Sequence, residues 1–135
     1  MGLLIEKPSF LNYLTGFENL KLLADINKIA SVETIKSFMT EYGMDPESPK
    51  KVKEYSLGMK QKLGIIQAIM EDPVLLVLDE PTSALDETTI NIFRNYLNTH
   101  KDNKIIVMTS HNKDDINTIC THVFTMTDGV LQETA

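Results

Sequence analysis

The chain has 135 residues, of which 42% are hydrophobic and 24% are charged, an ordinary balance for a globular domain. Its formal charge of −6 argues against an electrostatic surface for nucleic acid or anionic lipid. Cys120 is the single cysteine, which excludes an intramolecular disulfide and fits a reducing compartment. No apolar run approaches the ~20 residues of a membrane-spanning helix. We therefore expect one domain with a modest core.

The first half of the chain carries three helical patterns. Their expected starts are Thr15, Ser31 and Ser56. Gly43 is the expected stop of the second helix, and residues 45–49 contain two prolines and predict a loop. The third helix is expected to end before Asp72-Pro73. These patterns predict a compact helical region before the first buried strand.

From Val74 onward the hydrophobic period alternates between that of strands and that of helices. The expected strands are 74–78, 104–110, 123–127 and 130–132. Asp86 and Asn112 are expected to cap the intervening helices. Asp128-Gly129 between the last two strands is a strong signal for a two-residue hairpin turn.

The most informative stretch is the apolar run 74–78, which is followed directly by Asp79, Glu80 and Pro81. It predicts a buried parallel strand that delivers two carboxylates to the carboxyl edge of a sheet, where ligands of open α/β sheets bind. Two carboxylates at that edge suit a hydrated Mg²⁺ and a water that attacks a phosphate. The alternative is a buried strand that ends in a solvated acidic turn.

Four motifs occur in a fixed order around this strand. They are the stretches Tyr55–Gln61, Asp79-Glu80, Ser83–Asp86 and Thr109–His111. In this order and spacing the chain resembles the ATP-binding-cassette (ABC) ATPase family over nearly its whole length. The first motif resembles the family signature in a Ser-Leu-Gly-Met form, and the others resemble the Walker B pair, the D-loop and the switch histidine.

The resemblance implies an α/β fold class: part of a P-loop NTPase core, with a parallel sheet and helices, plus an α-helical subdomain. Residues 1–72 would form the Q-loop and helical subdomain with the signature, and residues 73–135 the Walker B half of the core. No G-x-x-x-x-G-K-[ST] phosphate loop occurs in the sequence. We therefore interpret the chain as the carboxyl-terminal part of a nucleotide-binding domain; a short protein that never binds nucleotide is the alternative.

The resemblance also implies a division of labour between three residues, with ATP and Mg²⁺ as cofactors. Asp79 would hold Mg²⁺, chiefly through water, and Glu80 would polarise the water that attacks the γ-phosphate. His111 would contact the γ-phosphate, although a lone histidine at a strand end is more often a surface residue. The same surface interpretation applies to His100 and His122.

Four further residues are assigned by the resemblance. Ser56 and Gly58 lie where a helix begins, a position that favours phosphate, and would complete the site of an opposite subunit in a two-domain sandwich. Asp86 would orient that interface, which is compatible with a role as helix cap. Glu6 stands where the family's Q-loop usually has glutamine, so it would reach the metal while adding negative charge.

The function implied is that of the ATP-binding and ATP-hydrolysing subunit of an ABC transporter, cytoplasmic and peripheral on the inner face of the cell membrane. Its partners would be a second nucleotide-binding domain and a transmembrane permease, with no nucleic acid. The signature and the stretch Leu4–Pro8 resemble the exporters and immunity transporters of peptide antibiotics. The residues Phe10–Tyr13 would help to receive the permease, or else simply pack under the helices.

Two alternatives remain open at this point: a non-catalytic remnant that acts as an interaction module, and a soluble cassette ATPase that acts on ribosomes or DNA. In every case we expect the isolated chain to be inactive, because it lacks the phosphate loop. In the family the strand that leads into that loop lies between the strand at 105–108 and the strand at 123–126. We therefore expect a gap there, an unpaired strand edge and a chain that is marginally stable or oligomeric.

Overall fold

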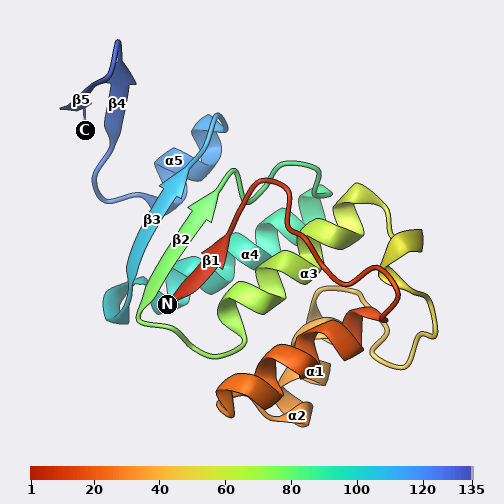
Figure 1. Cartoon of the computed structure of the whole chain (residues 1–135). Helices are drawn as coiled ribbons and strands as arrows, with labels where there is room; N and C mark the ends of the chain where they lie inside the picture. Colours follow the sequence, from red (N-terminus) through yellow and green to blue (C-terminus); the bar gives the residue numbers. More distant parts are fainter. Residues whose placement is uncertain (135) are drawn as a thin grey trace.

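A computed structural model, which describes residues 1–134, has an α/β fold built on a small parallel sheet (Figure 1). The sheet contains β1 (Gly2–Leu4), β2 (Leu75–Asp79) and β3 (Ile105–Thr109) in the order β1-β2-β3, and both pairings are parallel. Because β2 is central, its carboxyl end lies between the loops that follow β1 and β3. The predicted α/β class with a parallel sheet and helices is confirmed.

The remaining elements follow the expected alternation closely. The helices are α1 (Gly16–Asn27), α2 (Val32–Glu41), α3 (Leu57–Ile69), α4 (Glu87–His100) and α5 (Lys113–Ile119). Short 3₁₀ turns occur at Val52–Glu54 and Lys101–Asn103, and the carboxyl-terminal hairpin consists of β4 (Phe124–Thr127) and β5 (Val130–Glu133). Each predicted helix is present within one or two residues of its expected start.

Local capping explains where these helices begin. At every N-cap a side-chain oxygen accepts a hydrogen bond from an amide of the first turn. The five capping residues are Thr15, Ser31, Ser56, Asp86 and Asn112. At Thr15 the bond is reciprocal, since Glu18 Oε2 accepts from the Thr15 amide at 2.7 Å and completes a capping box. All five starts were predicted from the sequence.

Strand β1 is not among the expected strands, because the family resemblance assigns the start of the chain only to the Q-loop. Residues 2–4 pair in register with residues 76–78 of β2. Gly2 permits this pairing: a Cβ atom there would collide with the carbonyl oxygen of Ala68 at the end of α3. Strand β1 therefore fits closely between β2 and α3, and it places Glu6 just beyond the carboxyl edge of the sheet.

The two faces of the sheet differ strongly in exposure. Leu4, Leu76 and Leu78 are buried on the face covered by helices α3 and α4, in one core cluster with Leu63 and Phe93. On the opposite face the apolar residues of β2 are half-buried, whereas those of β1 and β3 are exposed. The exposed residues include Leu3, Ile105 and Val107.

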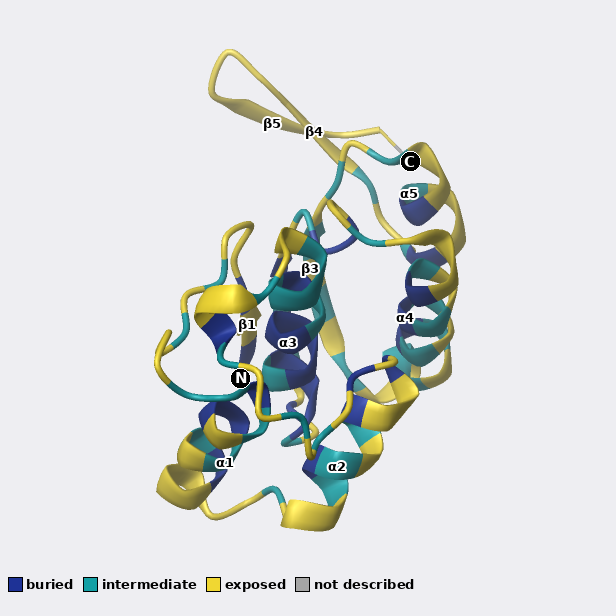
Figure 2. Ribbon diagram, turned by 90° about the vertical axis from the view of Figure 1, so that its right-hand side faces the viewer, coloured by how far each residue is buried: buried dark blue, intermediate teal, exposed yellow. Residues whose placement is uncertain are grey.

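The hairpin of β4 and β5 projects away from the rest of the molecule (Figures 1 and 2), and all eight of its strand residues are exposed. Its turn has Asp128 and Gly129 at φ +51° and +78°, as a two-residue turn of type I′ requires. Within residues 1–134, β3 pairs only with β2 and β4 only with β5. The prediction that β3 and β4 do not pair is therefore confirmed.

Candidate functional site

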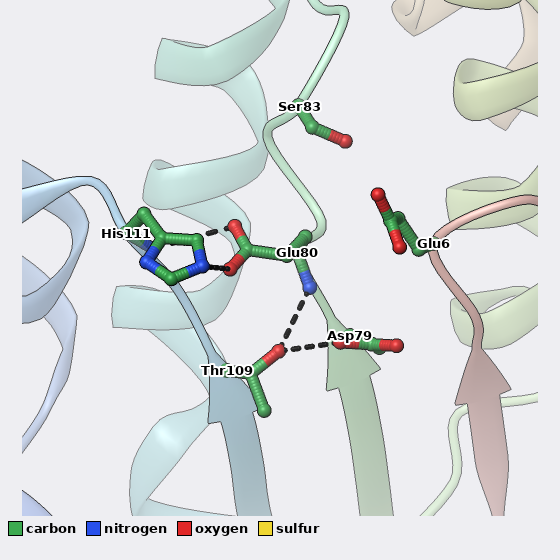
Figure 3. Close-up of a pocket in the computed structure, with 6 residues that line it drawn as sticks. All are labelled: Glu6, Asp79, Glu80, Ser83, Thr109 and His111. Carbon is green, nitrogen blue, oxygen red and sulfur yellow. Dashed lines mark hydrogen bonds and ion pairs between the residues drawn. The ribbon is translucent and has the colours of Figure 1, made fainter. Parts of the chain in front are cut away.

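A pocket of about 440 Å³ lies at the carboxyl edge of the parallel sheet (Figure 3). Its lining residues are Glu6, Asp79, Glu80, Ser83, Thr109 and His111. They come from the loop after β1, the end of β2 with its following turn, and the end of β3 with its following turn. The structure thus brings together four of the residues singled out from the sequence and adds Ser83 and Thr109, which were not assigned a role.

Thr109 ties the ends of β2 and β3 together at the floor of the pocket. The parallel register places Thr109 opposite Asp79, and its hydroxyl donates a hydrogen bond to Asp79 Oδ1 at 2.6 Å. The Glu80 amide in turn donates to the hydroxyl of Thr109 at 3.1 Å and to its carbonyl oxygen at 3.2 Å. One threonine therefore orients the Asp79 carboxylate and fixes the backbone from which Glu80 departs.

Glu80 has a left-handed backbone, with φ +47°, which is uncommon for a residue with a side chain. Residues are held in such conformations only where surrounding contacts enforce them, often at functional sites. The Glu80 carboxylate accepts from the His111 amide at 3.3 Å, and its other oxygen lies 3.3 Å from His111 Nε2. The His111 side chain is 97% exposed, so its ring meets the pocket mainly through Glu80.

The pocket is acidic, because it contains the carboxylates of Glu6, Asp79 and Glu80 and none of its lining residues is lysine or arginine. No group of three or more His, Cys, Asp or Glu within residues 1–134 is arranged to enclose a metal ion. Mg²⁺ does not need such a cage, since it keeps several waters and takes one or two carboxylates together with substrate phosphates. The donor chemistry around Asp79 therefore fits a hydrated Mg²⁺.

Ser56 and Gly58 lie outside this pocket, at the amino-terminal end of α3. The Ser56 hydroxyl accepts from the Met59 amide at 3.2 Å. A Cβ atom on Gly58 would lie 2.9 Å from the carbonyl oxygen of Ala84, so the start of α3 approaches the turn after β2 too closely for most side chains. Ala84 itself has φ +64°. The predicted signature and D-loop are thus in direct contact.

Asp86 also lies outside the pocket and caps α4. Its carboxylate accepts from the Thr89 hydroxyl at 2.7 Å and the Thr89 amide at 3.2 Å, and these bonds lower the pKa of Asp86 to about 2. Lys62 of α3 approaches the same carboxylate at 3.5 Å. The lowered pKa keeps Asp86 ionised in mildly acidic as well as neutral solution, and its contact with Lys62 links the start of α4 to α3.

Two buried polar groups beside the pocket were not recognised from the sequence. The side-chain amide of Gln61 donates to the Pro81 carbonyl oxygen at 2.9 Å and holds the turn after Glu80 against α3. Asp115 of α5 is fully buried and binds both Thr82 and Arg94. Gln61 is recognisable as the last residue of the signature stretch, whereas nothing in the sequence distinguishes Asp115 from its neighbour Asp114.

A second, apolar groove of about 290 Å³ lies along α1. Phe10 and Leu11 form one side of it, and Leu22, Leu23 and Ile26 of α1 contribute to the other. Tyr13, the other aromatic residue of this loop, is 69% exposed and does not line the groove. Within residues 1–134, no helix has the length and apolar character required to cross a membrane.

Comparison with curated proteins gives relatives that match almost the whole chain. An uncharacterized ABC transporter ATP-binding protein of Bacillus subtilis (strain 168), YybJ, is 41% identical over 98% of this chain and 61% of its own length. The bacitracin transport ATP-binding protein BcrA of Enterococcus faecalis is 38% identical over 98% of this chain and 44% of its own length. The lantibiotic transport ATP-binding protein SrtF of Streptococcus pyogenes is 34% identical over 82% and 48%, respectively.

These relatives agree with the resemblance to the peptide-antibiotic subgroup that the signature and Leu4–Pro8 indicated. The chain spans between 44% and 61% of the length of YybJ, BcrA and SrtF. The similarity therefore concerns about half of each relative.

Solved structures confirm the fold. The ATP-binding subunit of an ABC transporter superposes with a TM-score of 0.86 at 23% identity, covering 98% of this chain and 58% of that one. The ATP-binding cassette MJ0796, in a dimeric post-hydrolysis state bound to ADP and Pi, superposes with a TM-score of 0.83 at 19% identity. The ABC transporter family model itself matches residues 1–83, which is more than half of the chain. The chain belongs to the ABC transporter family.

Proposed function

We propose that this chain is the portion of an ABC transporter ATP-binding subunit that carries the hydrolytic carboxylates. The observation that carries the proposal is the convergence of Glu6, Asp79, Glu80 and His111 on one pocket at the carboxyl edge of a parallel sheet. Ligands of α/β sheets bind at that edge. The proposed division of the chain is 1–72 for the Q-loop and helical subdomain and 73–135 for the Walker B half of the core.

The roles follow from the contacts of each side chain. Asp79, oriented by the Thr109 hydroxyl, would hold Mg²⁺, with Glu6 approaching from the other side of the pocket. Bound Mg²⁺ would supply neutralisation of the phosphate charge. Glu80 would accept the proton of the attacking water, because its carboxylate is directed into the pocket by a left-handed backbone and the His111 amide. His111, exposed at the rim, would meet a phosphate oxygen.

The pocket fits the metal and the attacking water better than it fits the phosphates. Its lining is acidic, and the chain has no glycine-rich loop with lysine to cradle the β- and γ-phosphates. The relatives extend beyond the region that this chain matches. We expect that additional region to supply the phosphate loop, and the isolated chain to bind Mg-ATP no tighter than the millimolar range, about −4 kcal/mol.

A second nucleotide-binding domain is the proposed partner at the signature surface. Ser56, Gly58 and Asp86 do not line the pocket of their own chain, which supports a role toward an opposite subunit. Ser56 caps a helix of 13 residues, α3, whose first amides carry the partial positive charge that favours phosphate. Ser56 is exposed at this start, so a phosphate of the opposite subunit can approach it.

A membrane permease is the proposed second partner, which would place the protein on the cytoplasmic face of the membrane. The groove between Phe10, Leu11 and α1 is apolar and open, as a surface that receives a short permease helix would have to be. Export of a peptide antibiotic or a similar amphiphile is the proposed transport activity. It is supported by the names of the relatives BcrA and SrtF and by the Ser-Leu-Gly-Met form of the signature.

The direct test is to complete the cassette. The part of YybJ that lies outside the matched region is joined to this chain, and ATP hydrolysis is measured beside that of the chain alone. The fusion should hydrolyse ATP, and the chain alone should neither hydrolyse it nor bind it in the micromolar range by calorimetry. A folded fusion without hydrolysis would favour the interaction-module alternative, and micromolar ATP binding by the chain alone would refute our interpretation of the pocket.

A further inference from the structure

A fully buried carboxylate lies behind the pocket and is not part of its lining. Asp115 belongs to α5 and has no exposed surface. Its Oδ2 atom accepts from the Thr82 hydroxyl at 2.5 Å and from the Ser110 hydroxyl at 3.3 Å. Arg94 of α4 donates a hydrogen bond from Nε to the Oδ1 atom at 2.7 Å, and Arg94 Nη2 forms an ion pair with the same oxygen at 2.5 Å. Both oxygens are therefore satisfied, one by a cation and the other by two loop hydroxyls.

The two hydroxyls belong to the two loops that carry the catalytic pair. Thr82 follows Glu80 by two residues in the turn after β2, and Ser110 directly precedes His111 in the turn after β3. Residues 82 and 110 are far apart in sequence, and they meet at a single carboxylate oxygen. The Ser110 hydroxyl also accepts from the Asn112 amide at 3.0 Å, so the start of α5 is held by the same contact.

The direct contact between Glu80 and His111 is too weak to hold these loops in place. Both of its distances are 3.3 Å, and the His111 side chain is almost fully solvated. Exposed ion pairs contribute little because water screens them and ordering two side chains costs entropy. Thr109 holds the end of β2 and the Glu80 amide, but it lies two residues before His111 and binds neither the turn after Glu80 nor the turn that carries His111. A further interaction between the two loops, beyond the ends of the strands, is needed to fix the positions of Glu80 and His111.

We propose that Asp115 is a positioning residue: anchored by Arg94, it locks the Glu80 loop to the His111 loop through Thr82 and Ser110. The arrangement is rigid because a buried charge-assisted hydrogen bond is strong and costly to leave unmade. The proposal rests on the proposed function, in that the locked pair is the catalytic one. The lock itself is a property of the chain without nucleotide and can be measured without it.

The test uses hydrogen–deuterium exchange, read by mass spectrometry, on the full 135-residue chain. Thr82→Val removes one hydroxyl of the lock while leaving Asp115 paired with Arg94. Exchange in the segment 109–114, which belongs to the other loop, should accelerate by at least about fivefold, the equivalent of ~1 kcal/mol for one lost hydrogen bond. Thr82→Ser keeps the hydroxyl and should restore slow exchange. Thr99→Val is the matched control, because Thr99 bonds only within α4 at the Asn95 carbonyl.

A substitution on the opposite side of the lock provides a second test. Ser110→Ala should accelerate exchange in the segment 80–86, by a smaller factor because its bond to Asp115 is longer. If Thr82→Val changes exchange only around residue 82, or if Thr82→Ser accelerates the 109–114 segment as much as valine does, the proposed lock is wrong. Because no nucleotide is used, this outcome is separate from the ATPase test of the completed cassette, and either can fail without the other.

Discussion

The carboxyl edge of β2 and β3 and the outer side of β3 differ in how completely they are supported. At the carboxyl edge, Thr109, Gln61 and Asp115 bind the turns from three directions, and helices α3 and α4 bury the face beneath. On the outer side, β3 has no second neighbour among the residues that the structure describes, and the hairpin beyond it is exposed throughout.

This contrast indicates which parts of the fold are self-sufficient. The chain exposes 8084 Å², which is roughly 1,000 Å² more than a folded monomer of this mass is expected to expose. A standard protein interface buries about 800 Å² on each partner. The excess is therefore of the size that one further packed segment or partner would remove, whereas the helix-covered face needs nothing more.

The largest expected contrast is in stability, for the same substitution in the two regions. Phe93→Ala should lower the free energy of unfolding by about 3–5 kcal/mol, because Phe93 is fully buried under the sheet. Phe124→Ala in the hairpin should change it by less than about 0.5 kcal/mol, since that side chain is 54% exposed. Urea unfolding of both variants measures the contrast, and equal losses would show that the hairpin is packed in solution.

Breaking a buried charged pair and breaking an exposed one should show a similar contrast, with smaller losses of stability. Asp115→Ala should cost about 3 kcal/mol, because it leaves Arg94 without a partner in a site that is mostly buried. Asp25→Ala, which breaks the exposed pair with Lys21 on α1, should cost less than about 0.5 kcal/mol. Thermal unfolding followed by circular dichroism compares the two. If Asp115→Ala lowered the stability only slightly, Arg94 would be readily hydrated without its partner, and this result would contradict a rigid lock.

A substitution on the outer side of β3 should change the self-association of the chain and hardly change its stability. Val107 is 54% exposed on an unpaired strand edge, and lysine at such an edge discourages strand-to-strand pairing. Val107→Lys should shift the isolated chain toward monomer in sedimentation velocity, with a change in unfolding free energy within about 0.5 kcal/mol. Ile29→Lys, at a position between α1 and α2 that is 66% exposed, should leave association unchanged. A parent chain that is already monomeric would refute the expectation of self-association.

The parts that could be predicted from the sequence are those governed by local chemistry. Helix starts at Thr15, Ser31 and Asp86 follow from side chains that bond amides three residues away, and the hairpin follows from Asp128-Gly129. The sheet class followed from the run that ends at Asp79, and the position of Glu80 and His111 at one edge followed from the parallel order of their strands.

The parts that could not be predicted depend on contacts between distant segments. Strand β1 is three residues long and carries no periodic pattern; it exists because Gly2 allows it to fit between β2 and α3. Asp115 is identical in type to Asp114, and only the approach of Arg94 and Thr82 makes it a buried anchor. Neither arrangement has a local sequence signal, since both depend on the packing of α3, α4 and α5.

The central claim is that the pocket at the carboxyl edge is the hydrolytic half of an ABC ATPase site, and Glu80→Gln in the cassette completed with YybJ tests it most directly. Single-turnover ATP hydrolysis and ATP binding are measured beside Glu33→Gln, an exposed glutamate of α2 remote from the pocket. We predict that Glu80→Gln lowers hydrolysis by a factor of ~10² or more with ATP binding retained, because the general base is lost, and that Glu33→Gln has no effect. Undiminished hydrolysis in Glu80→Gln would contradict the account.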